Sequence, residues 1–133
     1  MDNSENKSPL LGSRKLYGEG GLPVVVLELS GSQSPETLRG FQDILSEELR
    51  SSSNCMVVDM AKVSYLNSPD LSALYFSLKE SRTTGGDLRL CNLTGSVKLA
   101  FETMHLNDLF EIFDNQQGAV ASFVKNPPTK LDS

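Results

Sequence analysis

Short apolar runs alternate with amphipathic stretches along most of the chain. Residues 23–29 and 55–60 form largely apolar runs, a pattern typical of buried strands, and residues 87–92 are predicted as a third core strand. After each run, apolar residues recur at the spacing of a helix with one buried side. The alternation predicts mainly parallel strands that are joined by right-handed helical crossovers.

Further elements flank this repeating pattern. A short strand and a Gly-rich turn at residues 18–21 precede the first run and predict an N-terminal hairpin. A last strand at residues 109–115 and a short closing helix complete the chain. With 133 residues, the chain is long enough for one core. We therefore expect one α/β domain with a mixed, mainly parallel sheet of about five strands and about four helices.

This domain is expected at residues 14–125. The stretches 1–13 and 126–133 are polar, show no periodicity, and are predicted to be flexible tails.

The predicted helices each carry one apolar stripe. The stripes consist of Leu38, Phe41, Leu45 and Leu49 in the first helix, Leu71, Leu74, Tyr75 and Leu78 in the second, and Val97, Phe101 and Met104 in the third. On the second helix, Pro69, Ala73 and Phe76 share the opposite side, which we expect to be exposed. Phe76 would then be a large aromatic side chain in contact with water.

Composition and charge argue against several classes of function. The net charge of -5 and the lack of a basic patch argue against a nucleic-acid partner. No apolar run is long enough for direct insertion into a membrane, and the polar N-terminus does not have the pattern of a secretory signal. These features predict a cytoplasmic protein.

Cysteine and histidine offer little chemistry. Cys55 falls early in its predicted strand and Cys91 late, so parallel pairing would offset their sulfurs by roughly 13 Å, too far for a disulfide. Reduced, buried cysteines are typical of cytosolic proteins. His105 is the single histidine of the chain, so a metal site is not expected. We expect His105 at a helix end.

A catalytic site is not expected either, and neither is a cofactor. Asp59 closes a predicted strand at the edge where α/β proteins place their sites. No histidine, lysine pair or second carboxylate converges on Asp59 by sequence. The Gly-rich stretches read as turns, because neither lies between a strand and a following helix.

Ser68 allows two interpretations. Ser34-Pro35-Glu36 and Ser68-Pro69-Asp70 have the same pattern, in which the serine oxygen caps a helix that begins with proline and an acid. Capping alone would explain Ser68. An exposed Phe76 on the same helix also favours a contact with a partner.

Several stretches match a known family. "VVVLELSG", "CMVVDMAKVSYLNSPDLSAL" and "TTGGDLRLCNLTGSVKLAFETMHLNDLFEIF" follow its pattern of strands, turns and helices from about residue 22 to residue 123. On these stretches the chain resembles the STAS domain, in particular bacterial anti-sigma factor antagonists. The last stretch is the most specific, since its spacing matches throughout.

The resemblance implies partner switching in transcription regulation. In these antagonists the switch helix begins Asp-Ser-Ser/Thr-Gly, and the first hydroxyl residue is phosphorylated; that position is Ser68 here. The unmodified protein would bind an anti-sigma factor that is itself a serine kinase, phosphorylation would release it, and a serine phosphatase would reset it. The motif departs from the family at Asn67, Pro69 and Asp70, and Asp70 would repel an incoming phosphate.

The resemblance also implies a partner-binding edge. The loop after Gly31 is about three residues shorter than in typical antagonists and should lie beside Ser68. The residues expected to bind a partner are Ser32, Gln33, Ser34, Asn67, Pro69, Asp70, Ala73 and Phe76.

Other functions stay open at this point. STAS domains also form cytoplasmic subunits of membrane transport complexes, such as anion transporters and lipid-transporting ATPases, and the altered motif favours that alternative. A nucleotide hydrolase using Asp59 ranks last. We expect a monomer or a weak dimer, since the hairpin edge could pair with another copy.

Overall fold

The computed structural model describes residues 10–30, 41–51, 55–66 and 68–124. Five strands form one sheet in the order β1-β2-β3-β4-β5. They are β1 (Leu10–Tyr17), β2 (Pro23–Ser30), β3 (Cys55–Lys62), β4 (Asp87–Cys91) and β5 (Ile112–Phe113). β1 pairs with β2 antiparallel, and the other neighbours pair in parallel. The predicted mixed sheet with an N-terminal hairpin is confirmed.

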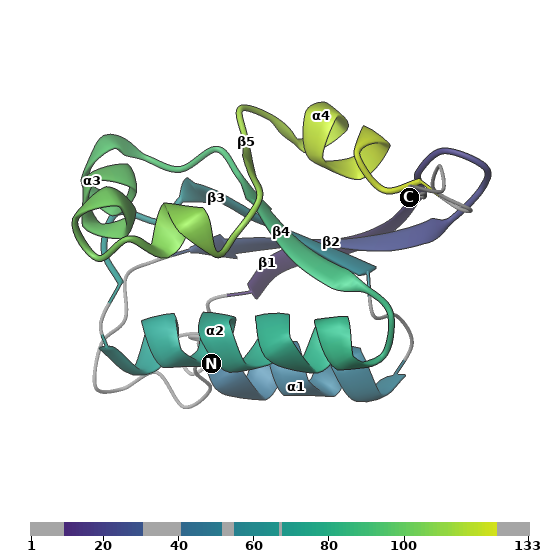
Figure 1. Cartoon of the computed structure of the whole chain (residues 1–133), viewed down its shortest axis with the longest axis horizontal. Coiled ribbons are helices and arrows are strands. Elements are labelled where there is room, and N and C mark those ends of the chain that lie inside the picture. Colours follow the sequence, from purple (N-terminus) through teal and green to yellow (C-terminus); the bar gives the residue numbers. More distant parts are fainter. Residues whose placement is uncertain (1–9, 31–40, 52–54, 67, 125–133) are drawn as a thin grey trace, which may run out of the picture.

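Helices cover both faces of this sheet. They are α1 (Phe41–Ser51), α2 (Ser68–Thr83), α3 (Gly95–Thr103) and α4 (Gln116–Ala121), with a short 3-10 turn η1 (Leu106–Asp108). Figure 1 shows α1 and α2 side by side on one face and α4 on the other, with α3 at the end where β3 finishes. The four helices within the described ranges agree with the number expected.

Two apolar layers follow from the alternation of side chains along each strand. The layer under α1 and α2 contains Leu27, Met56 and Leu88 of the sheet with Leu45 and Leu74 of the helices. The layer under α4 contains Val26, Val57 and Cys91 of the sheet with Val120 and Phe123. Burial on both faces explains why β2 and β3 contain nearly continuous apolar runs.

The N-terminal boundary of the domain differs from the prediction. β1 begins at Leu10, so residues 10–13, which the sequence predicts as tail, belong to the sheet. Gly12 and Ser13 carry little strand preference, yet they pair with Glu28 and Leu27 of the buried strand β2. Backbone pairing with a strong neighbour therefore overrides weak local propensity.

The region after α3 also differs in detail. Met104 is 54% exposed, so its predicted place on the buried stripe is wrong. Its backbone has already left the helix, with φ -94° and ψ 6°, and a residue outside the helix does not continue the helical stripe. His105 follows with φ 60°, which confirms its predicted position at a helix end. β5 is reduced to Ile112–Phe113.

Candidate functional site

The loop from β3 leads to Ser68, which is exposed and is the first residue of α2. The sequence predicts Ser68 as the residue that caps this helix, and the residue before it lies outside the described residues. Pro69 is also exposed and lies in the first turn, where a missing backbone N–H breaks no helical hydrogen bond. A macromolecule can therefore reach this end of α2.

Two hydrogen bonds fix the loop before Ser68 against the start of α3. Thr94 Oγ1 donates to the carbonyl oxygen of Val63 at 2.8 Å. Ser96 Oγ donates to the carbonyl oxygen of Ser64 at 3.2 Å. Since the Val63 side chain is fully buried, the loop is anchored on the core side as well. The position of Ser68 thus depends on contacts between three segments of the chain.

The exposed side of α2 includes Pro69, Ser72, Phe76 and Lys79. Phe76 is 64% exposed, the highest value for a large hydrophobic residue in the described part of the chain. The predicted exposure of Pro69 and Phe76 on one side of the helix is confirmed. An apolar surface therefore lies about two turns from Ser68.

Two other positions of α2 correct the prediction. Ala73 is buried rather than exposed, and Tyr75 is 36% exposed although the sequence places it on the buried stripe. The physical reason is that α2 packs against both the sheet and α1. Its buried side therefore turns toward α1 and consists of Asp70, Ala73, Leu74, Ser77, Leu78 and Ser81.

Asp70 also differs from its expected position. The residue is only 4% exposed, so it is not part of the accessible surface beside Ser68. The first turn of α2 places its side chain one turn before Leu74, on the buried side. The other expected contacts, Ser32, Gln33, Ser34 and Asn67, lie outside the described residues.

Sequence reasoning missed Tyr65. It lies in the loop three residues before Ser68 and is 62% exposed. No periodic pattern marks a loop residue as exposed, so the only available signal was an aromatic residue between a strand and a helix. Exposed aromatic side chains therefore lie on both sides of Ser68 in the sequence, with Tyr65 before it and Phe76 after it.

Asp59 lies among polar side chains on the α4 side of the sheet. Its carboxylate accepts hydrogen bonds from the backbone N of Ala61 at 2.9 Å, from Asn92 Nδ2 at 3.2 Å and from Gln116 Nε2 at 2.6 Å. Gln116 Nε2 also donates to Glu28 Oε2 at 2.7 Å. Contrary to the sequence expectation, a second carboxylate does converge on Asp59.

This convergence reflects strand register. Glu28 pairs with Asp59 across β2 and β3, and Asp59 pairs with Cys91 across β3 and β4. Arg14 of β1 approaches Glu28 at 3.7 Å and donates a hydrogen bond to Gln116. Both carboxylates therefore have donors from neighbouring elements, and the cluster holds the start of α4 against the sheet.

The two cysteines are free and buried, as predicted. Cys55 pairs with Asp87 and Cys91 with Asp59, so the two thiols lie at opposite ends of the paired region. Burial, reinforced by the charges of Asp59 and Glu28, raises the pKa of the Cys91 thiol to about 12. Burial likewise raises the pKa of Cys55. Both groups are thus un-ionised at neutral pH and poor nucleophiles.

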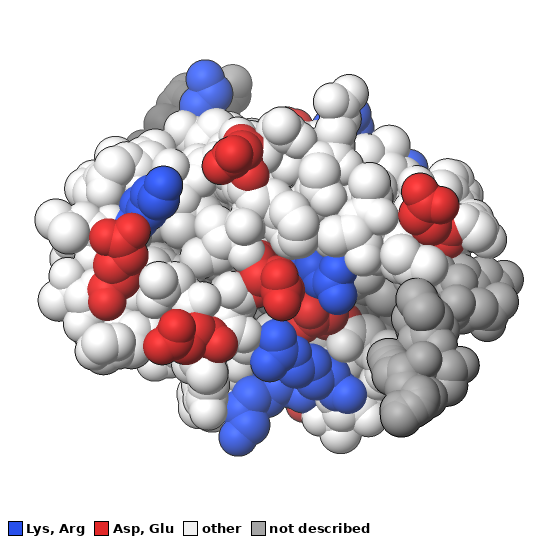
Figure 2. Space-filling view, turned by 45° about the horizontal axis from the view of Figure 1, so that its top comes forward, with Lys and Arg blue, Asp and Glu red and all other residues white. Residues whose placement is uncertain are grey.

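The face shown in Figure 2 carries acidic and basic side chains interspersed among a larger uncharged surface. Opposite charges meet near its middle and do not segregate into a broad basic area of the kind that binds nucleic acid. None of the helices in the described ranges has the length and apolarity to span a bilayer.

Comparison with known proteins identifies the family of this chain. The model of the STAS domain matches residues 16–119. BtrV of Bordetella bronchiseptica, named as an anti-sigma factor antagonist, is 28% identical over 68 residues. That match covers 51% of this chain and 59% of BtrV, so the chain spans somewhat over half of this relative's length.

Solved structures share the fold. An anti-sigma factor antagonist from Thermotoga maritima superposes with a TM-score of 0.67 at 19% identity, covering 80% of this chain and 90% of the other. The anti-sigma factor antagonist SpoIIAA, solved in its unphosphorylated form, superposes with a TM-score of 0.62 at 14% identity, covering 82% and 93%. At this level of identity, the likeness establishes the architecture.

Proposed function

Because this chain belongs to the STAS domain family, we propose that it is an anti-sigma factor antagonist that binds an anti-sigma factor through the start of α2. The observation that carries this proposal is the exposure of Ser68 on the same helix as the exposed Phe76. BtrV and the two solved relatives bear the same functional name. The protein would act by binding, with no catalysis of its own.

We propose further that phosphorylation of Ser68 controls this binding. Ser68 is accessible to a kinase, and the buried Asp70 offers that kinase little surface. A phosphate adds about 1.5 to 2 negative charges at neutral pH. The N-terminus of α2 would tolerate this charge, since the helix dipole is positive there.

Phosphorylation would release the partner by weakening the interface, without a change of fold. A partner that covers Ser68 together with Tyr65 and Phe76 would have to desolvate the phosphate beside apolar side chains. Removing a charged group from water without a paired cation opposes binding. The anchored loop keeps the modified serine in the same place, because Thr94 and Ser96 hold its backbone independently of the hydroxyl.

The test uses purified anti-sigma factors of the source bacterium, each incubated with this protein and ATP. Mass spectrometry is expected to map a phosphate to Ser68. Calorimetry is expected to show binding by the wild type, at least about tenfold weaker binding by Phe76→Ser, and loss of binding by Ser68→Asp. Ser13→Asp, an equal change at an exposed position of β1, is expected to bind like the wild type.

The possible results separate the two parts of the proposal. Equal binding by wild type and Ser68→Asp, with no phosphate on Ser68, would exclude phosphoregulation and leave binding intact. No binding to any anti-sigma factor, with co-purification of a transporter or ATPase subunit instead, would overturn the antagonist assignment in favour of a transport complex.

A further inference from the structure

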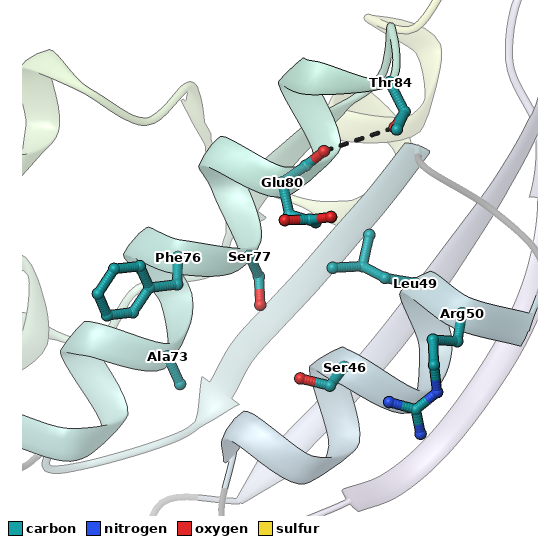
Figure 3. Close-up of a pocket in the computed structure, with 8 residues that line it drawn as sticks. All are labelled: Ser46, Leu49, Arg50, Ala73, Phe76, Ser77, Glu80 and Thr84. Carbon is teal, nitrogen blue, oxygen red and sulfur yellow. Dashed lines mark hydrogen bonds between the residues drawn. The ribbon is translucent and has the colours of Figure 1, made fainter.

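A groove of about 310 Å³ runs between α1 and α2, on the face of the sheet opposite α4. Leu49 of α1 contributes apolar surface, the buried Ala73 of α2 lies against the groove, and Phe76 stands at its side. Figure 3 shows the lining side chains of the two helices on facing walls. The exposed ring of Phe76 thus adjoins a concave apolar surface on the same molecule.

The two walls of the groove carry opposite charges. Arg50 lies on the α1 wall, and Glu80 lies on the α2 wall. Both residues are exposed, and within the described residues no ion pair links them. A binding surface with a cation on one side and an anion on the other is complementary to its own copy if rotation exchanges the two sides.

We propose that this groove is the contact surface for a second copy of the chain. Both helices follow strands of the parallel part of the sheet, so they run in the same direction. A two-fold axis along the groove therefore sets α1 of one copy against α2 of the other at the same level. Arg50 then faces Glu80 of the second copy, and the same pair forms a second time by symmetry.

The apolar part of the groove fits the same arrangement. Phe76 lies one helical turn before Glu80, just as Ser46, near Leu49, lies one turn before Arg50 on the opposite wall. Rotation about the axis brings each Phe76 ring against these residues of the other copy, which removes a largely exposed aromatic side chain from water. Because the apolar area is small and the ion pairs lie at its rim, the dimer has a weak affinity and forms only as the protein concentration rises.

This pairing does not rest on the proposed function, since it requires no anti-sigma factor. It does use Phe76, so self-association and partner binding compete for one side chain. The N-termini of both α2 helices lie at the same end of the dimer, because the axis runs parallel to the helices.

Sedimentation equilibrium over a range of concentrations tests the proposal. The wild type is expected to show a reversible monomer–dimer equilibrium. Arg50→Glu alone sets two glutamates against each other across the interface, and Glu80→Arg alone sets two arginines together, so each variant should dimerise about tenfold or more weakly. An equimolar mixture of the two single variants should recover the dimer, because each copy then supplies the charge that the other lacks.

A matched control is Lys98→Glu, which changes an exposed charge on α3 outside the groove, and it should leave the equilibrium unchanged. Circular dichroism of each variant shows whether the fold is kept. A wild type that stays monomeric throughout, single variants that dimerise like the wild type, or a mixture that stays monomeric would each overturn the proposal.

Discussion

Gln116 donates a hydrogen bond of 2.6 Å from its side-chain amide to the carboxylate of Asp59, and so joins the first residue of α4 to β3. The same Nε2 donates to Glu28 on the neighbouring strand at 2.7 Å. One amide therefore satisfies two carboxylates that strand register places next to each other. The docking of α4 depends on this contact as well as on its apolar side chains.

Removing this amide should destabilise the protein. In Gln116→Ala, Asp59 stays buried beside Glu28 and loses one of its donors. We expect the free energy of unfolding to fall by about 1–3 kcal/mol, the cost of leaving a buried polar group short of a partner. Urea unfolding measures the change. Gln117→Ala, at the exposed next position, is the control and should have almost no effect.

Gly18 and Gly95 should respond in opposite ways to alanine. A Cβ at Gly18 would lie 2.3 Å from the carbonyl oxygen of Phe123, so the backbone would have to move. Overpacking of this kind costs about 1–3 kcal/mol. At Gly95, a Cβ would meet nothing within 4 Å, and alanine favours the helix there. Thermal unfolding should show a lower Tm for Gly18→Ala and an equal or higher Tm for Gly95→Ala.

The contact between Thr94 and the loop before Ser68 can be removed with little change of shape. Thr94→Val deletes the hydroxyl that donates to the Val63 carbonyl oxygen. We expect a loss of about 1 kcal/mol in stability and faster amide hydrogen exchange in residues 63–66. Thr103→Val, an exposed change at the end of α3, should leave exchange in that loop unaltered. Equal exchange in both variants would contradict the anchoring role of Thr94.

Alkaline pH should weaken the fold through Cys91. Its pKa is raised from 9.0 to about 12, so the folded state favours the un-ionised thiol. This contribution to stability is fully present below pH 9 and is lost as the pH rises through about 12. Urea unfolding across this window should therefore show a smaller decline for Cys91→Ala than for the wild type. Parallel declines would show that Cys91 does not contribute.

Much of the fold was predictable because both faces of the central strands are buried. Apolar runs mark β2 and β3, whose two faces are both buried, and Leu88, Leu90 and Cys91 mark β4. β1 was harder to delimit, since Gly12 and Ser13 pair with β2 through the backbone alone. Met104 was misplaced because periodicity does not show where a helix stops.

The site was only partly predictable, for two reasons. Helical periodicity shows that a helix has a buried side but not which neighbouring elements cover it. Because α1 packs beside α2, Ala73 is buried and Tyr75 is exposed, the reverse of the expectation. Asp70 was expected at the surface from the family motif, which does not show that this residue is buried here. The convergence of Glu28 and Asp59 depends on register between strands that are distant in sequence, and no local pattern carries that information.

The pairing of Val124 with Glu19 has a practical use. This bridge, together with a hydrogen bond from the Glu19 backbone to Phe123 at 2.9 Å, fixes the last described residues beside the hairpin turn. Figure 1 places that turn at the far end of the sheet from the loop that leads into α2. Tethering the molecule to a sensor chip just beyond Val124 would accordingly orient Ser68 toward the flowing solution.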